Sequence, residues 1–223
     1  MVAGYTSGSM RRRQRNPSPL QRLVLFSIAI IALVGGYYWG NLHAPKNIGM
    51  LAAGLLEDPV ALRPIALRDQ FNEPFDNQRL VEYWNLVMFG YTRSRNDSPA
   101  MLTLSAQILN RMADRPELQK HIRVLFVTVD PEHDTPEVLG AFLKFYREDF
   151  LGLTGTISAI RAFAGQLGVR FQRQPANTEG DRIDHSTSLA LVDPRGRLFG
   201  LFTGRVDAAS IAHDLKLIMD KYD

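Results

Sequence analysis

Apolar residues in this chain form two kinds of pattern, continuous runs of strand length and repeats at helical spacing. Residues 85–92 (NLVMFGYT) and 122–129 (IRVLFVTV) are continuous apolar runs, which are typical of central strands buried on both faces. Between them, one helical face is formed by Leu102, Ser105, Ile108, Leu109 and Met112. We therefore predict a βαβ unit with a right-handed connection.

Helix signals continue this pattern. Thr135-Pro136-Glu137 supplies an N-cap, a proline at the first helical position and an acid in the first turn, which predicts a helix running toward Glu148. A short extended piece at 151–153 and a helix over 156–167 follow. Residues 187–203 then predict a hairpin on the turn Asp193-Pro194-Arg195-Gly196.

The last predicted element is a helix that Asp207 caps, with Ile211, Leu215 and Ile218 on its apolar face. A short hairpin over 67–77 precedes the βαβ unit. The order βαβ, helix, ββα is that of a thioredoxin-like α/β fold with an amino-terminal hairpin, and we expect this domain to occupy residues 62–223.

Residues 23–42 (LVLFSIAIIALVGGYYWGNL) contain no charge, and a helix of that length, at about 1.5 Å per residue, spans the roughly 30 Å core of a bilayer. We predict one transmembrane helix here, between a basic tail (1–22) and a linker (43–61). A cleaved signal peptide is the alternative, but the run is longer than such regions usually are and no A-x-A pattern follows it. A buried core helix is disfavoured because the run has no polar face.

Basic residues are concentrated before this run. Five of the 26 arginines and lysines lie in residues 1–43, which contain no acid, so 21 basic residues face 23 acidic ones in the remainder. The positive-inside rule therefore places the tail in the cytoplasm and the domain on the far side of the membrane. The slightly acidic domain argues against a nucleic-acid partner.

Three separated segments carry the candidate chemistry, namely FGYTRSRNDSP (89–99), VDPEHDTPE (129–137) and DHST (184–187). Together they resemble the SCO/SenC family, membrane-anchored thioredoxin-like proteins that deliver copper during cytochrome c oxidase assembly. The family pattern has two cysteines in the first segment and a histidine in the third, and these hold the copper. Here Ser94 and Ser98 stand at the cysteine positions and His185 at the histidine position.

The chain contains no cysteine. Thiolates are soft donors that suit Cu(I), whereas a serine hydroxyl is a hard, protonated oxygen, so family-like copper binding is not expected. Thiol–disulfide exchange requires sulfur pairs, which argues against a redox enzyme of the thioredoxin superfamily. We therefore expect a non-enzymatic protein without a bound cofactor, and we hold copper binding at His185 as the alternative.

Each candidate residue also has a structural interpretation. Ser98 precedes Pro99 and is expected to cap a helix, and Ser94 to lie in a solvated loop. The resemblance implies that His185 lies near both serines, where Asp97, Asp130, His133 and Asp134 are the conceivable helper ligands. Without them, His185 would be a partly buried histidine hydrogen-bonded within its loop.

The second motif crowds five titratable groups into residues 130–137. They could form an acid–base or hard-metal site. Alternatively, Asp130 and Asp134 organise the turn after the strand, with Glu132 and His133 in water. Arg93 and Arg95 make the first motif cationic, which suits either an acidic partner or a solvated loop.

The leading hypothesis is a single-pass membrane protein, with its domain in the periplasm or, in a eukaryote, the mitochondrial intermembrane space. It would act in respiratory-oxidase assembly through contacts with an oxidase subunit or assembly factor. A weak or shared copper chaperone that uses His185 is the second hypothesis, and a redox enzyme the disfavoured third.

Overall fold

A computed structural model describes residues 19, 30, 32, 34, 35, 53–174, 183–185, 187–204 and 207–222. The chain divides into two units, residues 1–47 and 48–223. Most of the first unit, including most of the predicted anchor at 23–42, lies outside the described residues. Among the positions that are described, no helix has the length and apolarity needed to cross a bilayer. The anchor therefore stays a prediction.

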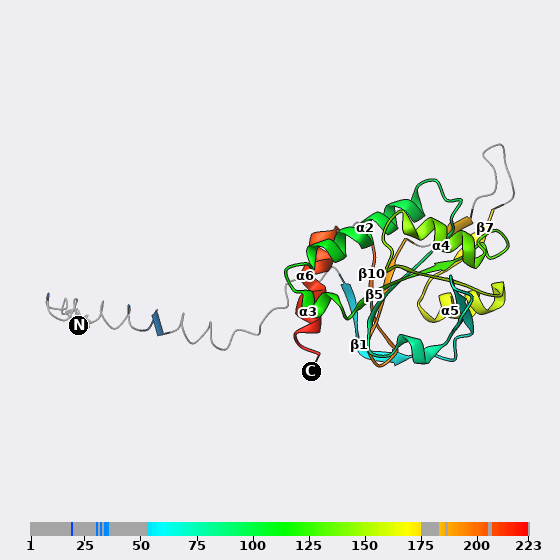
Figure 1. The fold of residues 1–223 in the computed structure, drawn as a ribbon. Helices are drawn as coiled ribbons and strands as arrows, with labels where there is room; N and C mark the ends of the chain where they lie inside the picture. The colour runs from blue at the N-terminus through cyan, green and yellow to red at the C-terminus, as the bar shows by residue number, and fades with distance from the viewer. Residues whose placement is uncertain are drawn as a thin grey trace, which may run out of the picture. The chain divides into compact units, whose positions relative to one another are not determined.

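The second unit is built on one eight-stranded sheet with the order β1-β10-β9-β4-β5-β6-β2-β3 (Figure 1). The strands in this order are β1 (Ala53–Ala61), β10 (Arg197–Phe202), β9 (Leu189–Val192), β4 (Trp84–Gly90), β5 (Ile122–Thr128), β6 (Leu151–Thr154), β2 (Leu67–Asp69) and β3 (Pro74–Phe75). β4, β5 and β6 are parallel, and the other neighbours pair antiparallel. A separate two-stranded sheet joins β7 (Phe171–Arg173) and β8 (Ile183–His185).

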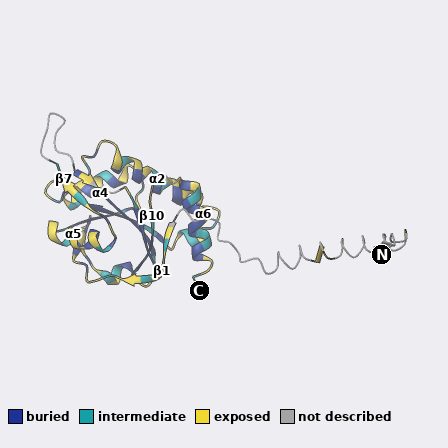
Figure 2. Cartoon of the chain, turned by 180° about the vertical axis from the view of Figure 1, so that it is seen from behind, coloured by how far each residue is buried: buried dark blue, intermediate teal, exposed yellow. Residues whose placement is uncertain are grey.

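The helices are α2 (Asp97–Arg111), α3 (Pro116–Gln119), α4 (Pro136–Lys144), α5 (Ile157–Gln166) and α6 (Ala208–Met219), with a 3₁₀ helix, η1, at Asn77–Leu80. α2, α4 and α6 pack on one face of the sheet, where their apolar residues share one core with Leu86, Met88 and Phe126. α5, η1 and β8 contribute to a second core on the other face. The central strands are therefore covered on both sides (Figure 2).

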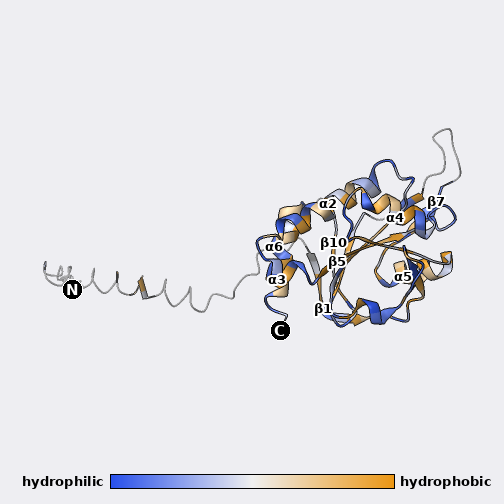
Figure 3. Cartoon of the chain, viewed as in Figure 1, coloured by the Kyte–Doolittle hydropathy of each residue, from blue (hydrophilic) through white to orange (hydrophobic). Residues whose placement is uncertain are grey.

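Burial explains why the two apolar runs are continuous. Every residue of β4 is buried, and so is every residue of β5 except Arg123. The strands at the centre of the sheet carry the strongest apolar character (Figure 3). The predicted βαβ unit, both hairpins and the N-caps at Thr135 and Asp207 are confirmed, since each cap side chain accepts a backbone amide of its helix.

Two boundaries differ from the prediction. Residues 43–61 were expected to be a linker, but Ala53–Ala61 form β1, which pairs with β10. The run is too irregular to read as a strand because its register breaks between Leu55 and Val60. The helix expected to reach Glu148 ends at Lys144, where a turn leads into the Arg147–Asp149 ion pair.

Candidate functional site

The first two sequence motifs meet because β4 and β5 are parallel. Gly90 is in register with Thr128, so the loops after both strands leave the same edge of the sheet. The amide of Val129 donates to the carbonyl oxygen of Gly90 at 2.8 Å, which joins the two loops at their starts. A site built on this edge is therefore held by the most buried part of the fold.

Asp134 ties the two loops together further along. Its side chain is fully buried and accepts hydrogen bonds from the amide of Thr92 at 3.0 Å, from the Thr92 hydroxyl and from the Thr128 hydroxyl. Because internal donors occupy both oxygens of this carboxylate, Asp134 is not a helper ligand for a metal. The prediction that Asp134 organises the turn after the strand is confirmed.

Neither serine has the role expected of it. α2 begins at Asp97, so Ser98 lies inside the first turn and is not the N-cap. Its buried hydroxyl oxygen instead accepts the amide of Tyr91 at 3.0 Å. Ser94, expected in a solvated loop, is only 7% exposed, and its hydroxyl oxygen accepts the amide of Ser98 at 3.3 Å. Ser94 therefore satisfies one of the free amides at the start of α2.

Close packing around Ser98 explains the glycine of the first motif. A β-carbon on Gly90 would lie 2.5 Å from the Ser98 hydroxyl oxygen and 2.8 Å from Cε2 of Phe126. Because real β-carbons do not approach that closely, only glycine fits without a shift of its neighbours. Ser98 is thus enclosed by the end of β4 and by the core.

Asp130 is the centre of an ion cluster. Its buried carboxylate contacts Nη2 of Arg93 at 2.7 Å, Nη2 of Arg173 at 2.6 Å and Nδ1 of His133 at 3.0 Å. The cluster joins the loop after β4, the loop after β5 and strand β7. Arg93 is therefore an ion-pair partner. His133 is exposed, as predicted, and its ring nitrogen also contacts Asp130.

The cluster fixes the charge of Asp130. Burial alone would raise the pKa of this carboxyl, but hydrogen bonds from Arg93 and His133 outweigh it and hold the pKa below its ordinary value. Asp130 is accordingly an anion near neutral pH. Glu132 at the rim has a side chain that is 77% exposed and lies 3.6 Å from Nη2 of Arg173, consistent with the predicted solvated position.

One set of donor atoms has a spacing that a metal could use. A carboxylate oxygen of Asp130, one of Glu132 and a ring nitrogen of His133 lie within 4.8 Å of one another. Two guanidinium groups already contact Asp130, and Nη2 of Arg93 also lies 3.0 Å from Nδ1 of His133. Positive charge at the point where a cation would bind means that this group does not fit a metal.

His185 lies at the end of β8, where its backbone is in register with Phe171 of β7. Its side chain is outside the described part of the chain. The amide of Ile183, two residues earlier, lies 3.4 Å from the hydroxyl oxygen of Tyr91, whose own amide binds Ser98. The structure therefore brings β8 into contact with the side chain of Tyr91. A position of His185 beside Ser94 and Ser98, and coordination by His185, stay predictions.

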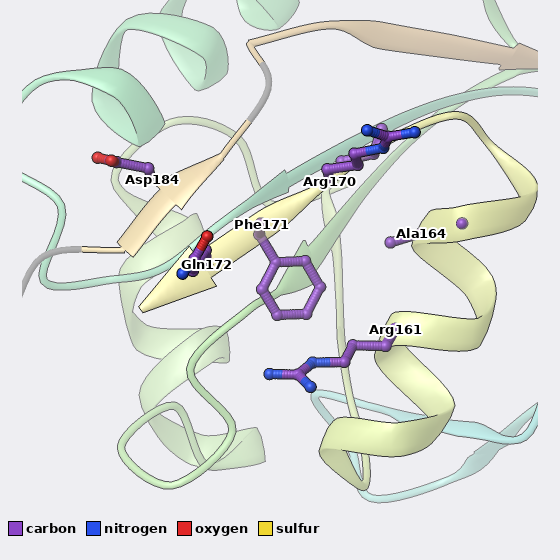
Figure 4. A pocket seen from close by; sticks show the side chains of 8 residues that line it. Arg161, Ala164, Arg170, Phe171, Gln172 and Asp184 are labelled. Atoms are coloured by element: carbon purple, nitrogen blue, oxygen red, sulfur yellow. The ribbon is translucent and has the colours of Figure 1, made fainter. Parts of the chain in front are cut away.

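The sequence patterns did not predict the pockets that lie beside β7. A pocket of about 650 Å³ lies between α5 and β7, with Arg161 on one side and Phe171 and Gln172 on the other (Figure 4). A second pocket, of about 470 Å³, lies beside Arg173 and Glu132. The Arg161 guanidinium stacks 5.7 Å from the centre of the Phe171 ring, which both pockets share. Neither pocket is lined by Ser94 or Ser98.

Comparisons with known proteins agree with this arrangement. The SCO1/SenC family model matches residues 57–220. The chain belongs to the SCO1/SenC family. It is similar to a Stutzerimonas stutzeri protein whose name describes it as copper-binding, with 32% identity over 168 residues, covering 74% of this chain and 80% of the relative. It is 27% identical over 197 residues to an SCO2-like protein of Rickettsia prowazekii, covering 87% of this chain and 95% of the relative.

Solved SCO structures show the same thioredoxin-like fold. Copper-bound ScoI of Bradyrhizobium japonicum has a TM-score of 0.63 at 25% identity and covers 71% of this chain and 99% of that one. Copper-bound yeast Sco1 has a TM-score of 0.66 at 24% identity and covers 74% and 91%. This SCO1/SenC chain therefore keeps the family scaffold without any cysteine.

Proposed function

We propose that this protein acts in cytochrome c oxidase assembly through protein contacts, with the copper–thiolate chemistry lost. One of its structural relatives is described as a member of the Sco family of cytochrome c oxidase assembly proteins, and two others were solved with copper bound. The chain retains the family scaffold but has serines at the two cysteine positions. This combination supports a role in assembly that is separate from copper binding. Copper would be cargo for such relatives, and this chain would serve the assembly step without carrying it.

The observation that carries the proposal is the use of both serine hydroxyls inside the fold. Each oxygen accepts a backbone amide, and both residues are buried. A serine that acted as a substitute ligand would need its oxygen turned toward a metal. As metal ligands these hydroxyl oxygens would be hard and neutral, and both are turned toward backbone amides. They therefore support a structural role.

The proposal includes an uncleaved anchor. The uncharged run at 23–42 and the arginines before it favour a single-pass protein of the inner membrane whose domain faces the periplasm, or the intermembrane space in a eukaryote. An oxidase subunit or an assembly factor is the proposed partner, at or beside the same membrane.

A weak or shared copper site that uses His185 is the second candidate. It is favoured by the hydrogen bond from the Ile183 amide to the Tyr91 hydroxyl, which joins the strand of His185 to a residue whose own amide binds Ser98. A partner could then supply the missing thiolates. A redox enzyme has no such support, since the chain has no sulfur pair to oxidise.

A complementation experiment separates these candidates. A strain that lacks the gene receives the wild-type protein, His185→Ala or Ser94→Cys/Ser98→Cys, and assembled oxidase is measured by haem spectra and activity. The proposal expects wild type and His185→Ala to restore assembly equally. Failure of His185→Ala alone would favour the copper candidate, and oxidase assembly that ignores loss of the gene would refute both.

Copper binding is measured in parallel on the full-length protein in detergent. Equilibrium dialysis against Cu(I) should show no stoichiometric binding that depends on His185. Stoichiometric copper that His185→Ala abolishes would contradict the loss of copper chemistry, whatever the complementation result.

A further inference from the structure

Helix α4 presents an apolar stripe to solvent. Val138 is 40% exposed and Phe145 is 87% exposed, and Ala141 between them is exposed as well. Phe145 still has helical dihedral angles (φ −66°, ψ −23°), so the three residues share one face at positions i, i+3 and i+7. The opposite face is the one that packs in the core, through Leu139 and Leu143. α4 lies at the surface of the domain with exposed residues along it (Figure 2).

The charges beside this stripe repeat with the same spacing. Glu137 in the first turn and Lys144 in the last turn are both exposed and lie seven residues apart, as Val138 and Phe145 do. The midpoint of the charged pair and the midpoint of the apolar pair along the chain both lie within half a residue of Ala141. The exposed face of α4 is therefore self-complementary when it is turned end to end.

We propose that this face of α4 pairs antiparallel with the same face of a second copy, on a two-fold axis that passes beside Ala141. In that arrangement Glu137 meets the partner's Lys144, and Val138 packs against the partner's Phe145. Each contact occurs twice, as a closed isologous interface requires. Alanine at the axis lets the two helices approach closely, because a larger side chain would hold them apart.

Charge complementarity favours a second copy over a lipid surface. Glu137 lies beside the stripe, and Glu148 and Asp149 are exposed just beyond the end of α4, where anionic headgroups would repel them. A face built to bind such a surface would be lined with lysines and arginines. The alternation of acid and base along α4 suits a partner that presents the same alternation reversed.

Interface size sets the expected strength. α4 has nine residues, about 13 Å of helix, so its face alone covers far less than the roughly 1,200–2,000 Å² of a stable interface. We therefore expect weak, reversible pairing.

Cross-linking at the axis tests the pairing, because the chain has no native cysteine. The full-length protein with Ala141→Cys is oxidised with diamide in detergent and run on a non-reducing gel. A disulfide needs α-carbons within about 7 Å, which only a residue close to the axis meets. The matched control is Val81→Cys, at an exposed apolar residue outside α4. Equal dimer yields from the two variants would overturn the proposal.

A charge exchange tests the orientation. In the Ala141→Cys background, Glu137→Lys should lower the dimer yield about fivefold, since two attractive pairs become repulsive. Adding Lys144→Glu should restore it. A yield that stays low in the exchanged protein, with unchanged circular dichroism, would rule out antiparallel pairing. Sedimentation equilibrium of Phe145→Ser, in a chain without added cysteine, is an independent test. A weight-average mass equal to that of wild type at every protein concentration would contradict the proposed interface.

Discussion

The amide of Ser98 donates a hydrogen bond to the hydroxyl oxygen of Ser94 at 3.3 Å, so the two positions that bear cysteine in the family pattern bind each other here. The hydroxyl oxygen of Ser98 accepts the amide of Tyr91 in turn. A short chain of hydrogen bonds thus runs from the end of β4 to the start of α2. The loop is held closed by hydrogen bonds from backbone amides to the serine hydroxyls, in place of the metal contacts that the resemblance implies for relatives.

This chain of hydrogen bonds predicts unequal effects of removing the two hydroxyls. Ser98→Ala removes the hydroxyl that accepts the buried amide of Tyr91 and should lower the free energy of unfolding by about 1–3 kcal/mol. Ser94→Ala removes a helix-end acceptor and should cost about 1 kcal/mol. Urea unfolding measures both, with Ser158→Ala at an exposed serine of α5 as the control. A larger loss for Ser94→Ala would contradict this account.

Gly90 should not tolerate a methyl group. Its β-carbon position meets Ser98 and Phe126, so Gly90→Ala is expected to lower the free energy of unfolding by about 1–3 kcal/mol. Gly165→Ala is the matched control, because it lies in α5 with no atom within 4 Å of its β-carbon position. That variant should gain about 0.5–1 kcal/mol from helix propensity. Thermal unfolding of both variants measures the two changes in stability. The packing requires a loss for Gly90→Ala and a gain for Gly165→Ala.

Asp130→Asn should make stability less dependent on pH. The folded pKa of Asp130 lies below its ordinary value, so its ionised form stabilises the fold above about pH 4, and this contribution is lost as the pH falls through the folded pKa. At pH 7 we expect Asp130→Asn to cost about 2 kcal/mol, because charged hydrogen bonds to Arg93 and Arg173 are lost.

Urea unfolding between pH 3 and pH 7 tests this dependence. The difference between wild type and Asp130→Asn should shrink toward the acid end. Glu132→Gln, at the exposed neighbour, should change stability by less than about 0.5 kcal/mol at any of these values. A constant difference across the range would mean that the charge of Asp130 is not what stabilises the cluster.

Restoring sulfur should restore copper binding. Ser94→Cys/Ser98→Cys places two thiols on the scaffold, and thiolates are the donors that Cu(I) prefers. Competition with a Cu(I) chelator should show one ion bound per chain, with a large loss of affinity when His185→Ala is added. Ser94→Cys alone is the control and should bind far more weakly. If the double variant binds no better than the single one, the three positions do not converge.

The sequence revealed elements whose residues interact locally. The caps at Thr135 and Asp207 are set by neighbours along the chain, and the burial of β4 and β5 on both faces leaves continuous apolar runs, so a pattern detects all of them. The edge strand β1 was missed because its pairing depends on β10, more than a hundred residues away. A strand with a broken register carries no regular alternation.

The same distinction holds for the site. The family motifs identify Ser94, Ser98 and His185 in order, but the function of each serine depends on where α2 begins, which is two residues earlier than the proline suggested. The ion pair between Arg173 and Asp130 joins residues 43 apart and leaves no local signal. Tertiary contacts of this kind require coordinates.

Both margins of the eight-stranded sheet end in strands that are poor templates for further growth. β1 contains Glu57, Asp58 and Pro59 at its register break, and β3 is two residues long and starts with Pro74. Proline lacks an amide hydrogen, and charges and bulges interrupt the row of free backbone groups that an incoming strand would need. The domain is thereby protected from amyloid-like stacking, so it can meet other proteins through side chains without risk of being drawn into a fibre by its backbone.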